Sequence, residues 1–126
     1  MLNLYQEIVM DHYRNPCNYG TIEGAHFMCQ ERNSACGDEV TFSGIIQDNA
    51  LVQVGFEGKG CVISLAMASM LAQHTKNKTI SAILAIDKDQ IVAMIGMPLG
   101  PVRLLCALLP LMALQKGISE HIQKAP

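Results

Sequence analysis

A chain of 126 residues, half of them hydrophobic and 16% charged, is long enough to bury the core of one domain, which we expect to span residues 1–126. The formal net charge is −2 and the basic residues are scattered, so the sequence predicts no binding to nucleic acid. Five cysteines without a recognisable leader indicate a cytoplasmic protein with reduced thiols, and the longest apolar run, residues 104–114, is shorter than a membrane span.

The first predicted element is an amphipathic helix over residues 2–13, where apolar side chains recur every three to four positions. Asn3 is its expected N-cap, because Gln6 follows three residues later as in a capping box. Pro16 ends the helix, since proline pushes the preceding residue out of the helical region.

Three strand candidates follow. Residues 25–32 are the first, and residues 40–46 and 52–56 alternate between apolar and polar or small side chains as half-buried strands do. Asp and Asn tolerate left-handed backbone, so residues 47–49 are expected to turn the second and third strands into an antiparallel hairpin.

Helices occupy the rest of the chain, and their predicted ranges are 62–74, 79–86, 87–95 and 101 to about 116. Gly117 is expected near the end of the last helix, and Pro101 suits its first turn. Pro110 predicts a kink or a break, because it cannot donate a hydrogen bond to the Cys106 carbonyl. Strands followed by helices predict an α+β fold, in which a three-stranded antiparallel sheet packs against four to five helices.

Four residues supply the chemistry that the sequence singles out. Cys36 and Asp38 stand directly before a predicted strand, Cys61 at the start of a predicted helix and Cys106 within the last one. Thiolates suit zinc and iron–sulfur clusters, and a carboxylate oxygen can complete either kind of site. There is no pair of CxxC motifs, so this interpretation rests on residue type and context. A free cysteine can also be a small buried hydrophobic residue, a reading that stays open for Cys106.

Cys61 is also a candidate sulfur acceptor, because a thiol at a helix N-terminus faces unpaired N–H groups that favour the thiolate. Gly37 and Gly60 either let the backbone approach a bound group or form ordinary turns. Arg103, three residues before Cys106, either steadies anionic sulfur or is a solvated surface residue.

The four histidines are expected to be structural or surface residues. His12 falls at the end of the first predicted helix, where packing or a favourable charge at the helix C-terminus explains it better than metal binding does.

Five segments carry a resemblance: Tyr5-Gln6-Glu7, the run from Asp11 to Pro16, Cys36-Gly37-Asp38, Gly58-Lys59-Gly60-Cys61 with Ser64 following, and Pro101-Val102-Arg103 leading to Cys106. Together they resemble the NifU N-terminal/IscU family of iron–sulfur cluster scaffold proteins over nearly the whole chain. The resemblance implies a SufE/NifU-like α+β fold with a three-stranded antiparallel sheet.

The resemblance also implies a function and a ligand set. Cys36, Asp38, Cys61 and Cys106 would hold a labile [2Fe–2S] cluster, built from iron and from sulfur that a pyridoxal-phosphate cysteine desulfurase delivers, for transfer to acceptor apo-proteins. The alternative is a zinc-dependent sulfurtransferase of the SufU type, in which Cys61 or Cys106 accepts persulfide and Zn²⁺ occupies the isolated protein. A scaffold is favoured over an enzyme. Cys17 and Cys29 match no ligand position of the family and are expected to be bystanders.

Departures from the family pattern place the chain between two branches. Leu105 stands where the IscU branch has a histidine, and the SufU branch also lacks that histidine but carries an insertion before its last cysteine. The IscU branch presents a Leu-Pro-Pro-Val-Lys stretch to its chaperone. Here that stretch is Leu99-Gly100-Pro101-Val102-Arg103, which puts docking of an Hsp70-type chaperone in doubt.

Overall fold

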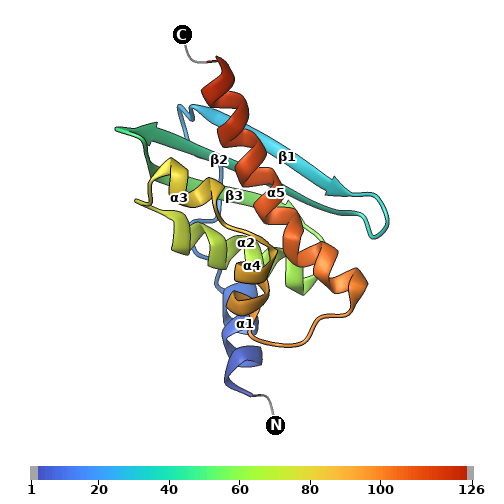
Figure 1. Ribbon diagram of the computed structural model, residues 1–126. Helices are drawn as coiled ribbons and strands as arrows, with labels where there is room; N and C mark the ends of the chain where they lie inside the picture. The colour runs from blue at the N-terminus through green and yellow to red at the C-terminus, as the bar shows by residue number, and fades with distance from the viewer. Residues whose placement is uncertain (1–2, 125–126) are drawn as a thin grey trace.

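A computed structural model of the protein describes residues 3–124 and has the expected α+β architecture (Figure 1). Its elements in chain order are α1 (Leu4–Arg14), β1 (Phe27–Asn33), β2 (Asp38–Gln47), β3 (Ala50–Lys59), α2 (Val62–Thr75), α3 (Ile80–Leu84), α4 (Lys88–Ile95) and α5 (Pro101–Lys124). The predicted fold class is therefore confirmed, with three strands and five helices in the part of the chain that the structure describes.

The sheet is antiparallel throughout, in the order β1-β2-β3. Asp48 and Asn49 form a two-residue turn between β2 and β3, with φ angles of 53° and 60°. Positive φ at both positions matches the twist of a tight hairpin, and Asp and Asn adopt it at low cost. The predicted hairpin is confirmed. At the end of the β1–β2 hairpin, Asn33 pairs with Asp38, so the short loop 34–37 projects from this edge.

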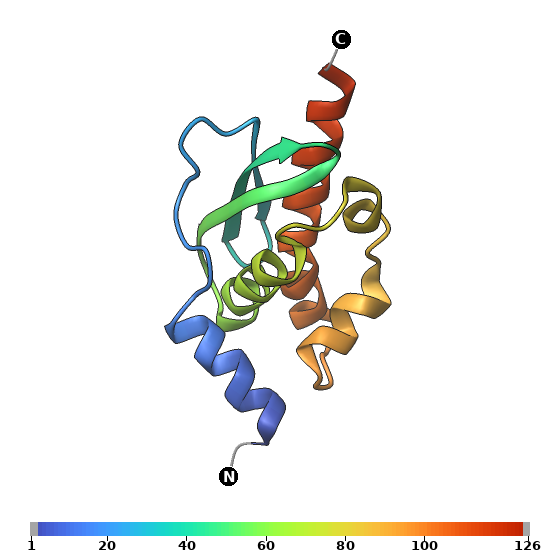
Figure 2. The same cartoon turned by 90° about the vertical axis from the view of Figure 1, so that its left-hand side faces the viewer.

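Two helices cover one face of the sheet, α5 over β1 and β2 and α2 next to β3 (Figures 1 and 2). Fully buried side chains from both layers fill the space between them, including Phe42 and Phe56 from the sheet, Met67 and Leu71 from α2, and Leu114 and Ile118 from α5. Burial of such large apolar side chains is the main favourable term in folding, so this layer fixes the positions of α2 and α5.

The N-terminal helix α1 packs on α2. Asn3 and Gln6 form the expected capping box, with the Asn3 side chain accepting from the Gln6 N–H at 2.9 Å and the Gln6 side chain accepting from the Asn3 N–H at 3.0 Å. Residue 2, the predicted helix start, lies outside the described residues. The following segment runs along the free edge of β3, where Tyr19 pairs with Phe56.

The short helices α3 and α4 begin where the sequence indicates. Thr79 caps α3 and Asp87 caps α4, each through a side-chain oxygen that accepts a backbone N–H. Gly96 ends α4 in the left-handed conformation, with φ of 68°, as helix C-terminal glycines commonly do.

The last helix is longer than predicted. α5 continues to Lys124, so its expected end near Lys116 and Gly117 is wrong. Gly117 lies inside the helix, and a Cβ atom there would sit 2.7 Å from the Phe27 ring and 3.0 Å from the Cys29 Cβ. This glycine therefore serves close packing of α5 on β1 rather than helix termination. The helix also runs unbroken through Pro110, which excludes a break there.

Among the described residues, α5 is the helix with the length and apolar composition to cross a membrane, although the apolar run 104–114 is shorter. Half of the most apolar 18-residue window of α5 is buried within the protein, and the helix packs against β1, β2 and α2. A core helix of an α+β fold has the same features, so its composition is explained by packing on the sheet.

Candidate metal centre

Cys36 and Asp38 are held by the turn between β1 and β2. The Asn33 carbonyl accepts hydrogen bonds from the N–H groups of Cys36 and Gly37, at 3.3 and 2.8 Å. Gly37 has φ of 78°, a conformation that suits glycine, and it lets the chain turn between the thiol and the carboxylate. Cys36 is exposed at the loop, whereas Asp38, the first residue of β2, is only 2% exposed.

Cys61 is the N-cap of α2. Its backbone is extended, and its sulfur accepts the N–H of Ser64 at 3.5 Å, where Ser, Thr, Asp or Asn usually stands. The Cys61 N–H donates to the Asp38 carboxylate at 3.1 Å. Gly60 makes this approach possible, since its φ is 142° and a Cβ atom there would overlap the Asp38 carboxylate. The close approach at Gly60 is therefore to the Asp38 side chain, and approach to a bound group stays a prediction.

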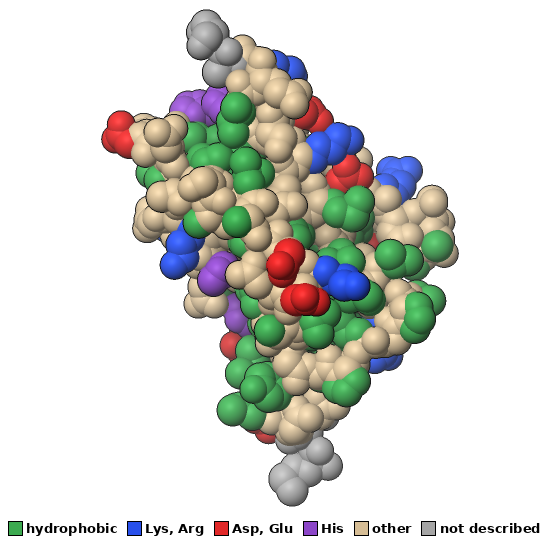
Figure 3. Space-filling view, in the orientation of Figure 1, with side chains coloured by type: hydrophobic (Ala, Val, Ile, Leu, Met, Phe, Trp, Pro, Cys, Tyr) green, Lys and Arg blue, Asp and Glu red, His purple; other side chains and the backbone are tan. Residues whose placement is uncertain are grey.

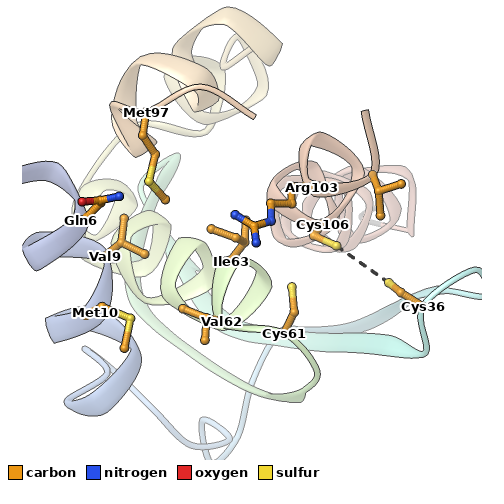
Figure 4. A pocket seen from close by; sticks show the side chains of 11 residues that line it. Gln6, Val9, Met10, Cys36, Cys61, Val62, Ile63, Met97, Arg103 and Cys106 are labelled. Carbon is orange, nitrogen blue, oxygen red and sulfur yellow. Dashed lines mark hydrogen bonds between the residues drawn. The ribbon is translucent and has the colours of Figure 1, made fainter. Parts of the chain in front are cut away.

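Cys106 lies in the second turn of α5 and is 3% exposed. Its sulfur is 3.8 Å from the sulfur of Cys36, although the two residues are 70 positions apart in the chain. Figure 4 shows both thiols facing each other across the mouth of the pocket, with the Cys61 thiol pointing toward the same space from the start of α2.

The structure brings three of the four predicted ligands into a compact group. The Cys36 and Cys106 sulfurs and an Asp38 oxygen lie within 4.8 Å of one another. The Cys61 sulfur is outside this group but borders the same pocket. A tetrahedral ion with metal–sulfur bonds of about 2.3 Å places neighbouring sulfurs roughly 3.8 Å apart. The Cys36–Cys106 spacing of 3.8 Å therefore fits two thiolates on one metal ion, and the donor set suits zinc and iron.

Burial and hydrogen bonds act in opposite directions on Asp38. Burial raises the pKa of its carboxyl, but hydrogen bonds from Ser64, Cys61 and Cys106 outweigh it, so the pKa is lower than usual. The pKa of the Cys106 thiol is raised well above its ordinary value, first by burial and then by its contacts with Asp38 and Cys61. The two shifts have opposite consequences: the lowered pKa favours the ionised form of Asp38, and the raised pKa favours the protonated form of Cys106.

A cavity of about 520 Å³ opens beside these residues. It is lined by α1, the start of α2, the connector before α5 and the first turns of α5 (Gln6, Val9, Met10, Cys36, Cys61, Val62, Ile63, Met97, Val102, Arg103, Cys106). The Arg103 guanidinium points into this space between the two helices, near Ile63 and Cys106 (Figure 4). Arg103 is an exposed residue, so both roles considered for it, stabilisation of anionic sulfur and solvation at the surface, stay predictions.

The remaining candidates lie elsewhere. His12 joins α1 to α2, with its Nδ1 atom 2.7 Å from the Ser69 hydroxyl, which also accepts the Cys17 N–H at 2.7 Å. This contact agrees with a packing role for His12. Cys29 is buried on β1 beside Gly117. His26 stacks on His121 with ring centroids 5.6 Å apart.

Ser64 belongs to the site although the sequence pattern assigned it no role. It is fully buried, and its hydroxyl lies 2.5 Å from an Asp38 oxygen and 3.1 Å from the Cys106 carbonyl oxygen. Its position three residues after Cys61, in the first turn of α2, is a signal for capping but carries no hint of the partners from β2 and α5.

Comparisons with known proteins show the family to which this chain is similar. Residues 4–126 match the family described as NifU-like N terminal domain. The chain is 33% identical to the zinc-dependent sulfurtransferase SufU of Bacillus subtilis, over 94% of this chain and 91% of that protein. It is 32% identical to the iron–sulfur cluster assembly scaffold protein IscU 1 of Archaeoglobus fulgidus, over 96% of this chain and 78% of the relative.

Solved structures agree as well. The FiSufU protein of Fervidobacterium islandicum superposes with a TM-score of 0.76 at 28% identity, covering 89% of this chain and 94% of that one. A NifU-like protein from Brucella abortus has a TM-score of 0.79 at 21% identity, covering 97% and 96% of the two chains, and shows the same fold. Sequence match, fold and identity to curated relatives agree, and the chain belongs to the NifU-like N-terminal domain family.

Proposed function

We propose that this protein is a scaffold on which a [2Fe–2S] cluster is assembled from iron and desulfurase-derived sulfur and from which it is passed to acceptor proteins. The observation that carries the proposal is the convergence of Cys36, Asp38 and Cys106 within 4.8 Å, with Cys61 on the same pocket. Membership of a family whose relatives include IscU scaffold proteins supports it.

The mixed donor set gives a physical reason for a cluster that is easily released. Thiolate sulfur binds iron tightly, whereas the harder carboxylate oxygen of Asp38 exchanges more readily. Cys36, Cys61 and Cys106 would retain the cluster while the Asp38 bond opens. The exposure of Cys36 leaves one side of the site accessible to an acceptor protein.

Sulfur delivery would begin at a thiol that a donor protein can reach. Cys61 is half-buried at the pocket and Cys106 is almost fully buried, so Cys61 is the more accessible of the two candidate acceptors. In the proposed step, the Cys61 thiolate attacks the outer sulfur of a desulfurase persulfide, and the desulfurase cysteine leaves as a thiolate. Arg103 would stabilise the anionic sulfur that results.

The surface around the pocket supports binding of partner proteins. Exposed hydrophobic side chains occur on α1 (Leu4, Tyr5, Ile8) and at the start of α5 (Val102, Leu105), and both helices line the pocket. Figure 3 shows hydrophobic side chains at the surface over α1 and over the beginning of α5. Apolar surface at a reactive site is typical of interaction surfaces, and we assign it to the cysteine desulfurase and acceptor proteins.

Reconstitution without air tests this proposal. Protein incubated with Fe²⁺, cysteine, a cysteine desulfurase and a thiol reductant such as dithiothreitol, which reduces the persulfide sulfur to sulfide, is expected to acquire iron and sulfide in equal amounts, with the visible absorption of a [2Fe–2S] cluster. Transfer to an apo-ferredoxin should follow. A preparation that takes up no iron or sulfide under these conditions would contradict the scaffold function.

A second candidate is zinc-dependent sulfur transfer. The 3.8 Å spacing of the Cys36 and Cys106 sulfurs fits a single tetrahedral ion, and the chain is 33% identical to a zinc-dependent sulfurtransferase. Bound zinc would keep the thiols deprotonated and shielded from oxidation. Stoichiometric zinc together with stimulation of a desulfurase, and no cluster on reconstitution, would favour this function over the first.

A further inference from the structure

Ser64 connects three of the four proposed ligand residues. Its hydroxyl oxygen lies 2.5 Å from Asp38 Oδ2, 3.1 Å from the Cys106 carbonyl oxygen and 3.6 Å from Cys61 Sγ, and its backbone N–H reaches the same sulfur at 3.5 Å. The side chain is fully buried. It thereby links β2 and α5 to the first turn of α2.

Pro110 leaves the Cys106 carbonyl without its usual helical donor. In a regular helix this carbonyl would accept the N–H of the residue four positions later, which here is a proline without an N–H. A buried carbonyl that lacks a partner is costly, and the Ser64 hydroxyl takes the place of the missing donor.

We propose that Ser64 is the positioning residue of the metal centre and that its hydroxyl also serves the Cys106 carbonyl, which Pro110 leaves without its usual helical donor. The inference rests on the proposed function, in which Asp38, Cys61 and Cys106 bind the metal. One hydroxyl proton is shared by two acceptors, of which the Asp38 carboxylate is the stronger. Ser64 thus holds the carboxylate and the backbone of Cys106 together before metal binds.

The test compares metal binding by variants under reducing conditions without air, using Zn²⁺ alone for affinity and Co²⁺ alone for visible spectra. Ser64→Ala is expected to weaken Zn²⁺ binding about 10- to 100-fold, as loss of outer-shell partners does, and to change the Co²⁺ ligand-field bands. Ser64→Thr retains the hydroxyl and should restore most of the affinity and the wild-type spectrum.

Ser69→Ala is the matched control. Ser69 is also a fully buried serine of α2, but its hydroxyl contacts His12 and Cys17 rather than the metal centre. It should leave both Zn²⁺ affinity and the Co²⁺ spectrum at wild-type values. If the loss of any buried hydroxyl weakened metal binding, both variants would bind Zn²⁺ less tightly. If Ser64 positions the metal centre, only Ser64→Ala will do so.

A double variant keeps the test informative if Ser64→Ala does not fold. Pro110→Ala returns an N–H to α5 that can satisfy the Cys106 carbonyl, so Ser64→Ala/Pro110→Ala should regain the folded circular dichroism spectrum. It should still bind Zn²⁺ weakly, because Asp38 remains without its hydroxyl donor.

Failure of the role of Ser64 can be distinguished from failure of the proposed metal binding. A folded Ser64→Ala or double variant with wild-type Zn²⁺ affinity and an unchanged Co²⁺ spectrum would overturn the role of Ser64 while leaving the proposed function intact. A wild-type protein that binds neither metal would overturn the metal-binding function and, with it, this inference.

Discussion

Asp38 shows how the site depends on single atoms. Its two carboxylate oxygens accept hydrogen bonds from the Cys61 N–H at 3.1 Å and the Ser64 hydroxyl at 2.5 Å. These donors keep the carboxylate ionised although it is 2% exposed, because together they outweigh the cost of burial. Asp38 lies close to Cys36 in the sequence. The two hydrogen-bond donors from α2, the Cys61 N–H and the Ser64 hydroxyl, could not be predicted from it.

We expect Asp38→Ala to lengthen the lifetime of a reconstituted cluster several-fold and to slow its transfer. The variant removes the exchangeable oxygen and leaves the thiols of Cys36, Cys61 and Cys106. Decay of visible absorption in the presence of a chelator measures the lifetime, and Glu39→Ala, one residue along β2, is the control. Equal decay rates in wild type and Asp38→Ala would argue against Asp38 as a ligand.

Alanine substitutions at Gly37 and Gly60 separate the cost of backbone strain from the cost of steric overlap. Both have positive φ, but a Cβ on Gly37 would meet open space and a Cβ on Gly60 would meet the Asp38 carboxylate. Gly37→Ala should cost roughly 1–2 kcal/mol of folding free energy through strain in the left-handed region, and Gly60→Ala should cost more because steric overlap adds to strain. Gly60→Ala should also weaken Zn²⁺ binding, as titration will show. Equal affinities for the two variants would refute the steric role of Gly60.

At the scale of elements, the packing of α5 on β1 sets where Cys106 lies. Gly117 lets the helix approach Phe27 and Cys29 closely, and this contact explains why the helix does not end at the glycine. A glycine near the end of a predicted helix usually indicates where the helix stops. At Gly117 the packing of α5 on β1 overrides that local preference.

Gly117→Ala should destabilise the protein by about 1 kcal/mol, since overpacking costs roughly 1–3 kcal/mol and alanine regains about 1 kcal/mol of helix propensity. Urea denaturation measures the difference. Gly100→Ala, at a position with open space around the added Cβ, is the control. A Gly117→Ala protein more stable than wild type would show that α5 can shift freely on the sheet.

The contact between α1 and α2 should make stability depend on pH. Burial lowers the pKa of His12, against a smaller opposite effect of Asp11. The unfolded chain therefore binds a proton near pH 6.5 that the folded protein takes up only at lower pH. Above the pKa of His12 in the unfolded chain, His12 costs the protein no stability. The free energy of unfolding then falls as the pH drops from that value through the lower pKa of His12 in the folded protein.

His12→Gln should flatten this loss of stability between about pH 7 and pH 5, as urea denaturation at a series of pH values will show. His74→Gln, which changes an exposed histidine of α2, is the matched control for loss of an imidazole. A slope that is the same in His12→Gln and wild type would exclude His12 as its source.

On the scale of the whole molecule, the site joins segments that are distant in sequence. The proposed ligand residues come from the β1–β2 turn and the first position of β2, the start of α2 and the second turn of α5. A bound metal ion would therefore cross-link the sheet to both helices that cover it.

Metal binding should raise the unfolding temperature, because free ion at about 100 times its Kd stabilises the folded state by about 2.7 kcal/mol. Addition of a chelator should reverse the effect, as thermal unfolding followed by circular dichroism will show. Cys106→Ser is expected to lose most of the gain, and Cys17→Ser, outside the metal centre, to keep it. A gain that survives Cys106→Ser would place the metal elsewhere.

Local chemistry in the sequence determined much of this fold. Asn3 with Gln6 set the start of α1, Asp48 with Asn49 set the β2–β3 turn, and Thr79 and Asp87 set the starts of α3 and α4. These features involve partners within four residues, so the pattern that predicts them is contained in a short window.

The ligand candidates were readable from residue type and family resemblance, but their arrangement was not. Only the tertiary structure brought Cys106 to within 3.8 Å of Cys36, across 70 positions of sequence, and placed Ser64 between Asp38 and the Cys106 carbonyl. The physical reason is that these contacts follow from how α2 and α5 pack on the sheet. Short-range patterns carry no information on that packing, and for the same reason they predicted an end of α5 at Gly117 that packing on β1 overrides.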